Sequence, residues 1–382
     1  MNENRAKRVG KKVEMVQEIS RRGFVTAGAG ALGLAGASAL GLAGAALAGC
    51  SSASPQKASS ASVSSGSADK PESVEVRVAS LKGPTTIGLV EFINRADLPG
   101  TEGGPSNTYT FTMSTAADEI LPKLIKGDVD IALIPANAAS VVYNKTKGGI
   151  TCLDINTLGV LSVVTGDASV KEFTDLAGRT VYLTGKGTTP EYVMNYLLDA
   201  AGIADSVTLE FKSEAAEVVS VLAADPAAVG VLPQPFATAA LVKNQALTAP
   251  VDLTDVWDAV QEADPARANK PSKLVTGVTV VRDEFLDAHR EAVWEFVAGQ
   301  RSSVQYVTGN PAEAAKLVVE QGIIDAEPVA AKAIPNCHIV CLTDAEMRDA
   351  LSGYLEVLYD ADPASVGGAL PDDDFYYETQ GA

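Results

Sequence analysis

The stretch Asp130-Ile-Ala-Leu-Ile-Pro-Ala-Asn137 contains a short, continuously apolar run that a proline ends. Such a run is typical of a strand that is buried on both faces of a sheet. The stretch Val229-Gly-Val-Leu-Pro-Gln-Pro-Phe236 repeats this pattern later in the chain. The sequence therefore predicts two structural units that share one design.

Each of these two strands closes a series of strand, turn, helix, strand and helix. Strands alternating with helices of this length are typical of an α/β protein. We therefore expect two mostly parallel sheets that are flanked by helices. The expected strands are 74–80, 109–113, 130–134, 180–184, 207–211, 229–232 and 276–281, and the expected helices between them are 83–94, 117–126, 190–201 and 215–224.

The strand at 276–281 is expected to bring the chain back to the first unit. Mainly helical sequence follows it, with helices expected at 284–309, 311–321, 328–333 and 343–359. We thus predict one lobe formed by 74–165 plus 276–382 and a second lobe formed by 166–275. Two chain crossings between two lobes make a hinge with a central cleft, which suits the enclosure of a ligand.

The N-terminal segment has the parts of an export signal: a basic region, an apolar region and small residues before Cys50. The pair Arg21-Arg22 followed by Phe24 resembles a twin-arginine motif, and Leu47-Ala-Gly-Cys50 resembles a lipobox. We predict that residues 1–49 are a signal peptide and that Cys50 is lipidated. The alternative is a retained transmembrane helix, because the apolar segment is long enough to span a bilayer.

The Ser- and Ala-rich segment 50–73 has no apolar periodicity and is expected to be a flexible tether. With the lipid on Cys50, it would hold the exported domain at the outer face of the cytoplasmic membrane. The chain has 30 basic and 48 acidic residues, a net charge of −18, which argues against nucleic acid as a partner.

The remaining cysteines are Cys152, Cys337 and Cys341, too few for a disulfide framework. We interpret Cys337 and Cys341 as small apolar residues on a strand, while a disulfide between them or a metal site stays open as the alternative. The sequence has only two histidines, His289 and His338, and none of the common catalytic motifs. We therefore predict no catalytic residue, no metal and no cofactor.

Candidate ligand-binding residues lie in loops that follow strands, because ligands of open α/β sheets bind beyond the carboxyl ends of the strands. Two of these loops place glycine and paired threonines at the start of a helix, where free N–H groups attract an anion. Ordinary N-capping by threonine is the alternative. The candidates in these loops are Gly83, Thr85, Thr86, Gly187, Thr188 and Thr189.

Other loops at the same ends of strands add three candidates, Ser114, Asn137 and Gln234. Lys82 and Lys186 flank the threonine loops and are candidate positive charges, although exposed lysines are common. Four aromatic residues are candidates for lining a pocket, with a place in the core as the alternative: Tyr182, Phe236, Trp257 and Trp294.

Several motifs together resemble one family. They are Asp130–Asn137, Asp175-Leu-Ala-Gly178, Gly185–Glu191, Leu232–Phe236 and the tail motif Pro371-Asp-Asp-Asp-Phe375. From Val74 to Tyr377 the chain resembles ABC-transporter solute-binding proteins of the nitrate/sulfonate/taurine and thiamine-pyrimidine-precursor group.

The resemblance implies a type II periplasmic-binding-protein-like fold that closes on a small ligand and docks to a permease with its ATPase. It places the loops at Gly83–Thr86, Asn137, Gly187–Thr189 and Gln234 along the cleft. Gln234 stands where many relatives have glutamate, which favours a less cationic or anionic ligand, while a wall-lining role stays open. We expect a monomeric binding protein without enzymatic activity.

Two other functions stay open at this stage. A lipoprotein of this kind also suits a sensor that reports ligand occupancy to a membrane kinase. An enzyme of pyrimidine-precursor synthesis has the same fold, but it needs clustered cysteines, which this chain lacks.

Overall fold

The computed structural model describes residues 73–98, 104–265 and 272–378, and all of these lie within one compact unit. The expected signal peptide, Cys50 and the tether up to Glu72 lie outside the described residues. Within the three described ranges, no helix combines the length and the apolar character that crossing a membrane requires.

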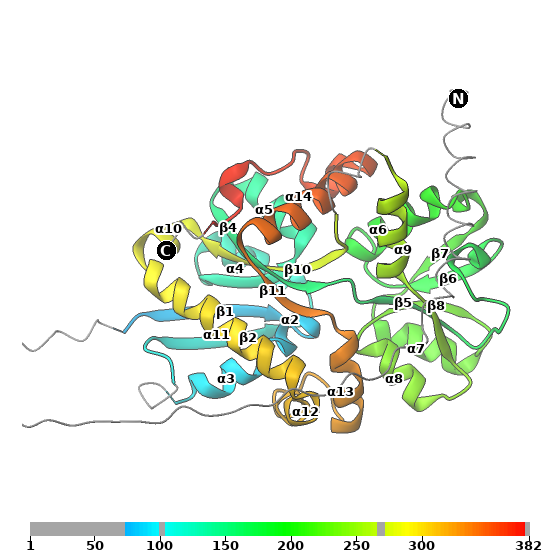
Figure 1. Cartoon of the computed structure of the whole chain (residues 1–382), viewed down its shortest axis with the longest axis horizontal. Coiled ribbons are helices and arrows are strands. Elements are labelled where there is room, and N and C mark those ends of the chain that lie inside the picture. Colours follow the sequence, from blue (N-terminus) through cyan, green and yellow to red (C-terminus); the bar gives the residue numbers. More distant parts are fainter. Residues whose placement is uncertain (1–72, 99–103, 266–271, 379–382) are drawn as a thin grey trace, which may run out of the picture. The chain divides into compact units, whose positions relative to one another are not determined.

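The first sheet has six strands in the order β11-β4-β10-β3-β1-β2 (Figure 1). Three strands that the sequence predicts, at 74–80, 109–113 and 130–134, belong to this sheet. The chain then crosses to the second sheet, and the strand predicted at 276–281 returns to the first. The strands are β1 (Glu75–Leu81), β2 (Thr108–Ser114), β3 (Ile131–Pro135), β4 (Ile150–Leu158), β10 (Val275–Arg282) and β11 (Ile339–Leu342).

The second sheet has five strands in the order β7-β6-β8-β5-β9. Its strands are β5 (Leu161–Thr165), β6 (Thr180–Leu183), β7 (Thr208–Phe211), β8 (Val229–Pro233) and β9 (Thr248–Asp252). Because β5 pairs within this sheet, a division of the chain by sheets places the first crossing at Gly159 and Val160, before residue 165.

The expectation that the sheets are mostly parallel is wrong, because both are mixed. The pairs β1–β2, β1–β3, β6–β7 and β6–β8 are parallel, whereas β10 and β5 run antiparallel to both of their neighbours. Those two strands enter after the chain crosses between the sheets, without the strand–helix–strand connection that keeps neighbours parallel. An apolar strand sequence does not encode its direction, so only the connections decide this point.

Helices cover both faces of each sheet (Figure 1). One face of the first sheet packs against α3, α10 and α11, and the other against α4, α5 and α14. The second sheet lies between α6 with α9 and α7 with α8. The bounds are α3 (Val90–Ala96), α4 (Leu121–Lys126), α5 (Ala136–Thr146), α6 (Thr189–Ala200), α7 (Ala215–Ala224), α8 (Phe236–Lys243), α9 (Leu253–Ala263), α10 (Asp283–Ala288), α11 (Arg290–Gly309) and α14 (Asp344–Ala361).

The expectation of a single helix at 83–94 is wrong, because the chain forms two helices there, α2 (Pro84–Ile87) and then α3. The break lies at Gly88, where a Cβ atom would come within 2.9 Å of Ile339 Cγ2. The close approach of β11 therefore needs a glycine here. The helix expected at 284–309 likewise divides into α10 and α11 at His289.

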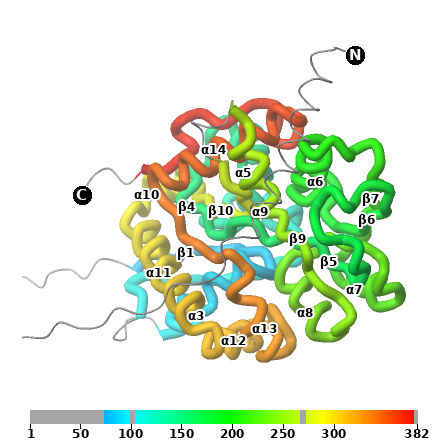
Figure 2. Tube along the Cα trace, turned by 45° about the vertical axis from the view of Figure 1, so that its right-hand side comes forward, coloured from blue at the N-terminus to red at the C-terminus, as the bar shows by residue number. Residues whose placement is uncertain are grey.

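One hydrophobic core runs through both sheets on the side of α5 and α14. Tyr354 of α14 packs on Trp257 of α9, with ring centroids 5.5 Å apart, and Trp257 packs on Tyr196 of α6 at 5.0 Å. At another edge α13 (Glu327–Ala333), which follows α12 (Pro311–Glu320), lies beside α8 (Figure 2). The two sheets are thus joined at two separate places.

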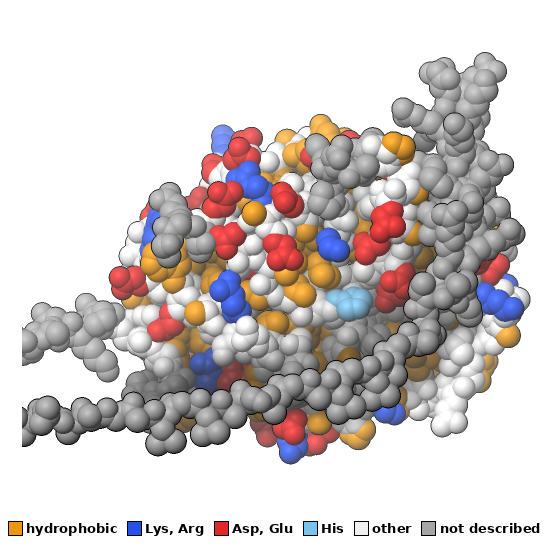
Figure 3. Space-filling view, viewed as in Figure 1, with side chains coloured by type: hydrophobic (Ala, Val, Ile, Leu, Met, Phe, Trp, Pro, Cys, Tyr) orange, Lys and Arg blue, Asp and Glu red, His pale blue; other side chains and the backbone are white. Residues whose placement is uncertain are grey.

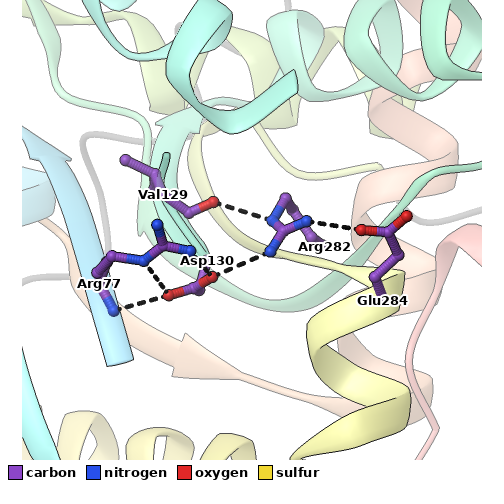
Figure 4. Close-up of polar contacts among 5 residues, drawn as sticks. All are labelled: Arg77, Val129, Asp130, Arg282 and Glu284. Atoms are coloured by element: carbon purple, nitrogen blue, oxygen red, sulfur yellow. Dashed lines mark hydrogen bonds and ion pairs between the residues drawn. The ribbon is translucent and has the colours of Figure 1, made fainter. Parts of the chain in front are cut away.

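A buried carboxylate ties together three strands of the first sheet (Figure 4). Asp130, 1% exposed, accepts hydrogen bonds from Arg77 of β1 at 2.6 and 2.8 Å and from Arg282 of β10 at 3.1 Å. Burial raises the pKa of Asp130, but the hydrogen bonds from Arg77 and Arg282 outweigh burial and hold this pKa below its usual value. Arg282 also pairs with exposed Glu284 at 3.0 Å.

Candidate functional site

The carboxyl ends of β1, β2 and β3 meet at one edge of the first sheet. Leu81 pairs with Ser114 in register, and the Lys82 amide donates to the Ser114 carbonyl at 2.8 Å. The β3 strand ends beside them at Pro135. The structure therefore brings together Gly83, Thr85, Thr86, Ser114 and Asn137, which the sequence had placed in three separate loops.

The hydroxyl groups of Thr85 and Thr86 already have partners inside the protein. Thr85 Oγ1 donates to the Leu81 carbonyl at 2.7 Å, and Thr86 Oγ1 lies 2.7 Å from Ser80 Oγ. Both threonines are buried. Gly83 has φ +139, a conformation that favours glycine. In this turn the threonines hold the end of β1 in place.

The corresponding turn of the second sheet is more open. Gly187 has φ +74, and Gly187 and Thr188 are exposed. Thr188 Oγ1 donates to the Gly185 carbonyl at 2.8 Å, and the Gly187 amide donates to Glu191. Thr189, the first residue of α6, is buried instead.

A buried polar contact links the two threonine-bearing units. Thr189 Oγ1 donates to Asn137 Oδ1 at 3.2 Å, and Asn137 Nδ2 donates to the Ser365 carbonyl at 3.3 Å. The fully buried hydroxyl of Tyr354 faces Thr189; burial raises the pKa of Tyr354 and Thr189 lowers it. The starts of α5 and α6 therefore meet, and their candidate side chains satisfy each other.

Gln234 lies at the end of β8 and is 8% exposed. Its backbone N–H donates to the Val160 carbonyl at 2.9 Å, and its side-chain Oε1 accepts from Thr238 Oγ1 at 2.8 Å. The side chain thus bonds to the first turn of α8.

A cavity of ≈380 Å³ lies between elements of the two sheets. Lys82 borders it from the end of β1, α7 and α8 form a second wall, and the connection from α12 to α13 forms a third. Its lining is mainly apolar: Ala216, Val219, Pro235, Phe236, Ala239, Ile323, Ile324 and Val329, with Ser220, Lys82, Lys243 and Asp325 as the polar members.

The charge of this cavity differs from that of the protein around it. Acidic side chains are spread over the face shown in Figure 3, and basic ones are fewer, in keeping with a net charge of −18. The cavity instead has two lysines against one aspartate. Because local charge governs which ions approach a cleft, this opening favours an anion.

None of the nine candidate ligand-binding residues lines this cavity, and they stay predictions. Of the weaker candidates, Lys82 and Phe236 do line it, and the others do not: Lys186, Tyr182, Trp257 and Trp294. The sequence gives no signal for Lys243, Asp325 and the apolar residues of α7 and α13. These residues lie on helix surfaces or in a helix connection, where the sequence has no signal that separates a cavity wall from an ordinary surface.

A fully buried aspartate lies in the sheet behind the threonine turn. Asp154 of β4 accepts hydrogen bonds from Thr279 at 3.0 Å and from Gln300 at 2.9 Å. Burial raises the pKa of Asp154 to about 7, although these two hydrogen bonds and the nearby charge of Arg301 lower it. The sequence analysis did not single out Asp154.

The three described cysteines are free, and Cys152 and Cys337 are buried. Burial raises the pKa of the Cys337 thiol to about 12, so this group stays a neutral thiol. Across the described part of the chain, no three His, Cys, Asp or Glu side chains come together in a way that would hold a metal ion.

Comparison with known proteins gives two results that agree. Residues 149–314 match the family described as NMT1/THI5 like. An ABC transporter structure from Parabacteroides distasonis is 25% identical, covers 81% of this chain and 100% of its own, and has a TM-score of 0.65.

Two further solved structures have the same fold at lower identity. The periplasmic aliphatic sulphonate-binding protein SsuA from Escherichia coli is 13% identical, with 81% of this chain and 95% of that one covered and a TM-score of 0.63. The alkanesulfonate-binding protein SsuA from Xanthomonas axonopodis pv. citri, bound to MOPS, is 13% identical, with coverage of 80% and 97% and a TM-score of 0.56.

A search of curated protein sequences finds no match to this chain. The resemblance predicted from the motifs is nevertheless confirmed by the family match and the solved structures, and the α/β fold class is confirmed with it. Residues 149–314 therefore match the model of the NMT1/THI5-like family, and the chain has the mixed α/β fold of the periplasmic binding proteins of ABC transporters.

Proposed function

We propose that this chain is the substrate-binding component of an ABC importer and that it captures a small organic anion in the cavity at Lys82. The cavity carries the proposal, because elements of both sheets line it and because it is basic in an acidic protein. Its ≈380 Å³ lies in the range of small-molecule sites, about 300–1,000 Å³. Similarity to sulphonate-binding proteins and to an ABC transporter structure supports the same function.

The lining favours an organic anion over an inorganic one. Eight of the twelve lining residues are apolar, so a ligand with a hydrocarbon part gains from burial against them. Nitrate has no hydrocarbon part to bury against these walls. A sulfonate or carboxylate with an alkyl or ring body suits this surface.

In this proposal two lobes, one built on each sheet, close on the ligand. The monomer then delivers the ligand to a permease that works with an ATPase, without chemistry of its own. A lipid on Cys50 keeps the domain near that permease at the outer face of the membrane. The loops at Gly83–Thr86, Ser114, Asn137, Gly187–Thr189 and Gln234 stay proposed ligand contacts on the sequence argument, although none of their candidate residues lines the cavity at Lys82.

The test is a thermal-shift and calorimetric screen of the purified full-length chain with propane-1-sulfonate, MOPS, nitrate and an aminopyrimidine. A true ligand raises Tm in proportion to its occupancy. We expect the sulfonates to bind, and Lys82→Gln and Lys243→Gln each to weaken binding about twofold to fivefold through the lost charge.

Lys123→Gln is the matched control, because Lys123 is exposed on α4 and does not line the cavity. It should leave the affinity unchanged. If the wild-type chain binds none of the organic anions, or if both cavity variants bind as well as the control does, the proposal is wrong.

A further inference from the structure

The chain passes from the first sheet to the second at Gly159 and Val160. Leu158, the last residue of β4, pairs with Val275 of β10 and so belongs to the first sheet. The Val160 carbonyl accepts a hydrogen bond at 2.9 Å from the backbone N–H of Gln234, which directly follows β8 of the second sheet. The change from one sheet to the other therefore takes place within two residues.

His338, which directly precedes β11, holds this link from the side of the first sheet. Its carbonyl accepts from the Leu158 N–H at 3.1 Å, and its Nδ1 donates to the Gly159 carbonyl. Nδ1 carries the proton in this contact, because a carbonyl can only accept. His338 has φ +43, a left-handed conformation that is uncommon outside glycine. One residue thus bonds to two consecutive residues of the crossing.

The second sheet and the return crossing pack against the same link. A Cβ atom at Gly159 would lie 2.3 Å from Thr254 Oγ1 and 2.8 Å from Leu274 Cδ2. Thr254 belongs to the first turn of α9, where Asp252 accepts from its backbone N–H at 2.8 Å. Leu274 is 1% exposed and directly precedes β10, so it lies where the chain returns to the first sheet. The two crossings therefore come together at Gly159, as the axis of a hinge requires.

We propose that His338 is a clamp on this hinge, whose imidazole ties the Gly159 carbonyl to the first sheet and favours the lobe arrangement of this structure. The clamp confines rotation to the link between Gly159 and Val160, because Leu158 and Gly159 both bond to His338. Without the imidazole the Gly159 peptide can turn, and glycine has the widest backbone freedom of all residues.

His338 is a positioning residue in this inference. It does not line the cavity at Lys82, so it acts on the lobes and not on a ligand. The inference goes beyond the proposed function, because the clamp works in the same way whatever the ligand is. Its test therefore needs no ligand.

The experiment measures distances within the full-length chain by pulsed EPR. Spin labels are attached through unnatural amino acids at Lys123 of α4 and at Asp205, which lies between α6 and β7; both positions are exposed. A second pair, Lys123 and exposed Arg290 of α11, stays within the first lobe. In His338→Gly, which tolerates positive φ but has no donor, the ratio of other lobe arrangements to the wild-type one should rise about fivefold, the effect of one lost hydrogen bond. The pair within the first lobe should keep its distance.

His338→Asn and His338→Asp separate the hydrogen bond from the rest of the side chain. Both new side chains tolerate the left-handed conformation, and their δ atoms lie one bond beyond Cγ, as Nδ1 of histidine does. Only asparagine has an N–H there. His338→Asn should therefore keep the wild-type distances, and His338→Asp should broaden them between the lobes. This pair decides the question even if His338→Gly does not fold.

His289→Asn is the matched control, because His289 lies between α10 and α11 of the first lobe and contacts neither crossing through its ring, which packs on Phe285. It should leave both label distances unchanged. The inference is overturned if His338→Asp keeps the wild-type distances between the lobes, if His338→Asn broadens them as much as His338→Asp does, or if the pair within the first lobe broadens equally. The proposed function fails separately, when the wild-type chain binds no organic anion.

Discussion

Two buried aspartates of the first sheet differ in their surroundings and therefore in their protonation. Asp130 has two arginines around it and stays ionised. Asp154 has only the neutral partners Thr279 and Gln300 within hydrogen-bond distance, and its Oδ2 has no partner among the described residues. Burial without a bonded cation is why the pKa of Asp154 lies near 7.

This difference predicts a pH dependence of stability. Between its usual pKa of 3.8 and about 7, Asp154 holds a proton in the folded chain and loses it in the unfolded chain. Its contribution to stability is therefore complete at low pH, falls as pH rises through this window, and is constant above it. Asp154→Asn removes this titration. The unfolding free energy of the variant should therefore rise relative to that of the wild type as pH rises through the window, by about 2–4 kcal/mol in total.

Denaturant unfolding of both chains at pH 4, 5.5, 7 and 8 measures this difference. Taking the difference between variant and wild type cancels the other groups that titrate in the same range. The groups around Asp154 are Thr279 of β10, Gln300 and Arg301 of α11, and the neighbouring thiols Cys152 and Cys341. A difference that does not change with pH would show that Asp154 does not titrate in this window.

At the scale of elements, α11 packs closely on α3 through one glycine. A Cβ atom at Gly299 would lie 2.7 Å from the ring of Phe92. That ring is fully buried among Tyr109, Phe111 and Phe296, at centroid distances of 5.0–5.8 Å. The aromatic cluster therefore has no room to shift.

This packing predicts opposite results for two changes in one helix. Gly299→Ala should destabilise the chain by about 1–3 kcal/mol, because overpacking outweighs the gain in helix propensity. Gly309→Ala, at the C-terminal end of α11, meets nothing within 4 Å and should be neutral or stabilising by less than about 1 kcal/mol. Chemical denaturation measures both values, and equal effects at the two sites would contradict the packing argument.

The prediction of elements from the sequence depended on how regular each pattern was. Strands such as β3 and β8, with continuous apolar runs that a proline ends, were predicted nearly to the residue. β4 was missed, because its sequence Ile-Thr-Cys-Leu-Asp-Ile-Asn-Thr-Leu mixes polar and apolar residues although almost all are buried. Two of its polar side chains, Asn156 and Asp154, form hydrogen bonds with β10 and α11, which are distant in the sequence.

At the scale of the whole molecule, a single core passes from the first sheet to the second through Trp257 and Tyr354. The cavity lies where α8 and α13 approach each other, apart from this core. If the two lobes move against each other on ligand binding, the shared core is the place that resists the motion most, because separating it would expose buried apolar surface.

The lipid anchor expected on Cys50 is a second property of the whole molecule, and it stays a prediction from the sequence. Cys50→Ala should release the exported protein from the membrane fraction, because the two acyl chains of the lipid would be lost. Fractionation of cells followed by immunoblotting measures this release. Ser51→Ala is the neighbouring control and should remain membrane-bound; a Cys50→Ala chain that also remains there would point to a retained helix instead.

The sequence by itself determined the α/β class, the family resemblance, most of the strands and the loops at the ends of β1, β3, β6 and β8. These follow from local patterns of apolar residues, glycine and proline, which act within a few residues of the chain. Only the tertiary structure decided that the sheets are mixed, that Asn137 and Thr189 bond to each other, and that Lys82, Lys243 and Asp325 line one cavity. The physical reason is that strand direction and cavity walls arise from contacts between segments far apart in the chain, and no local pattern encodes which segments will meet.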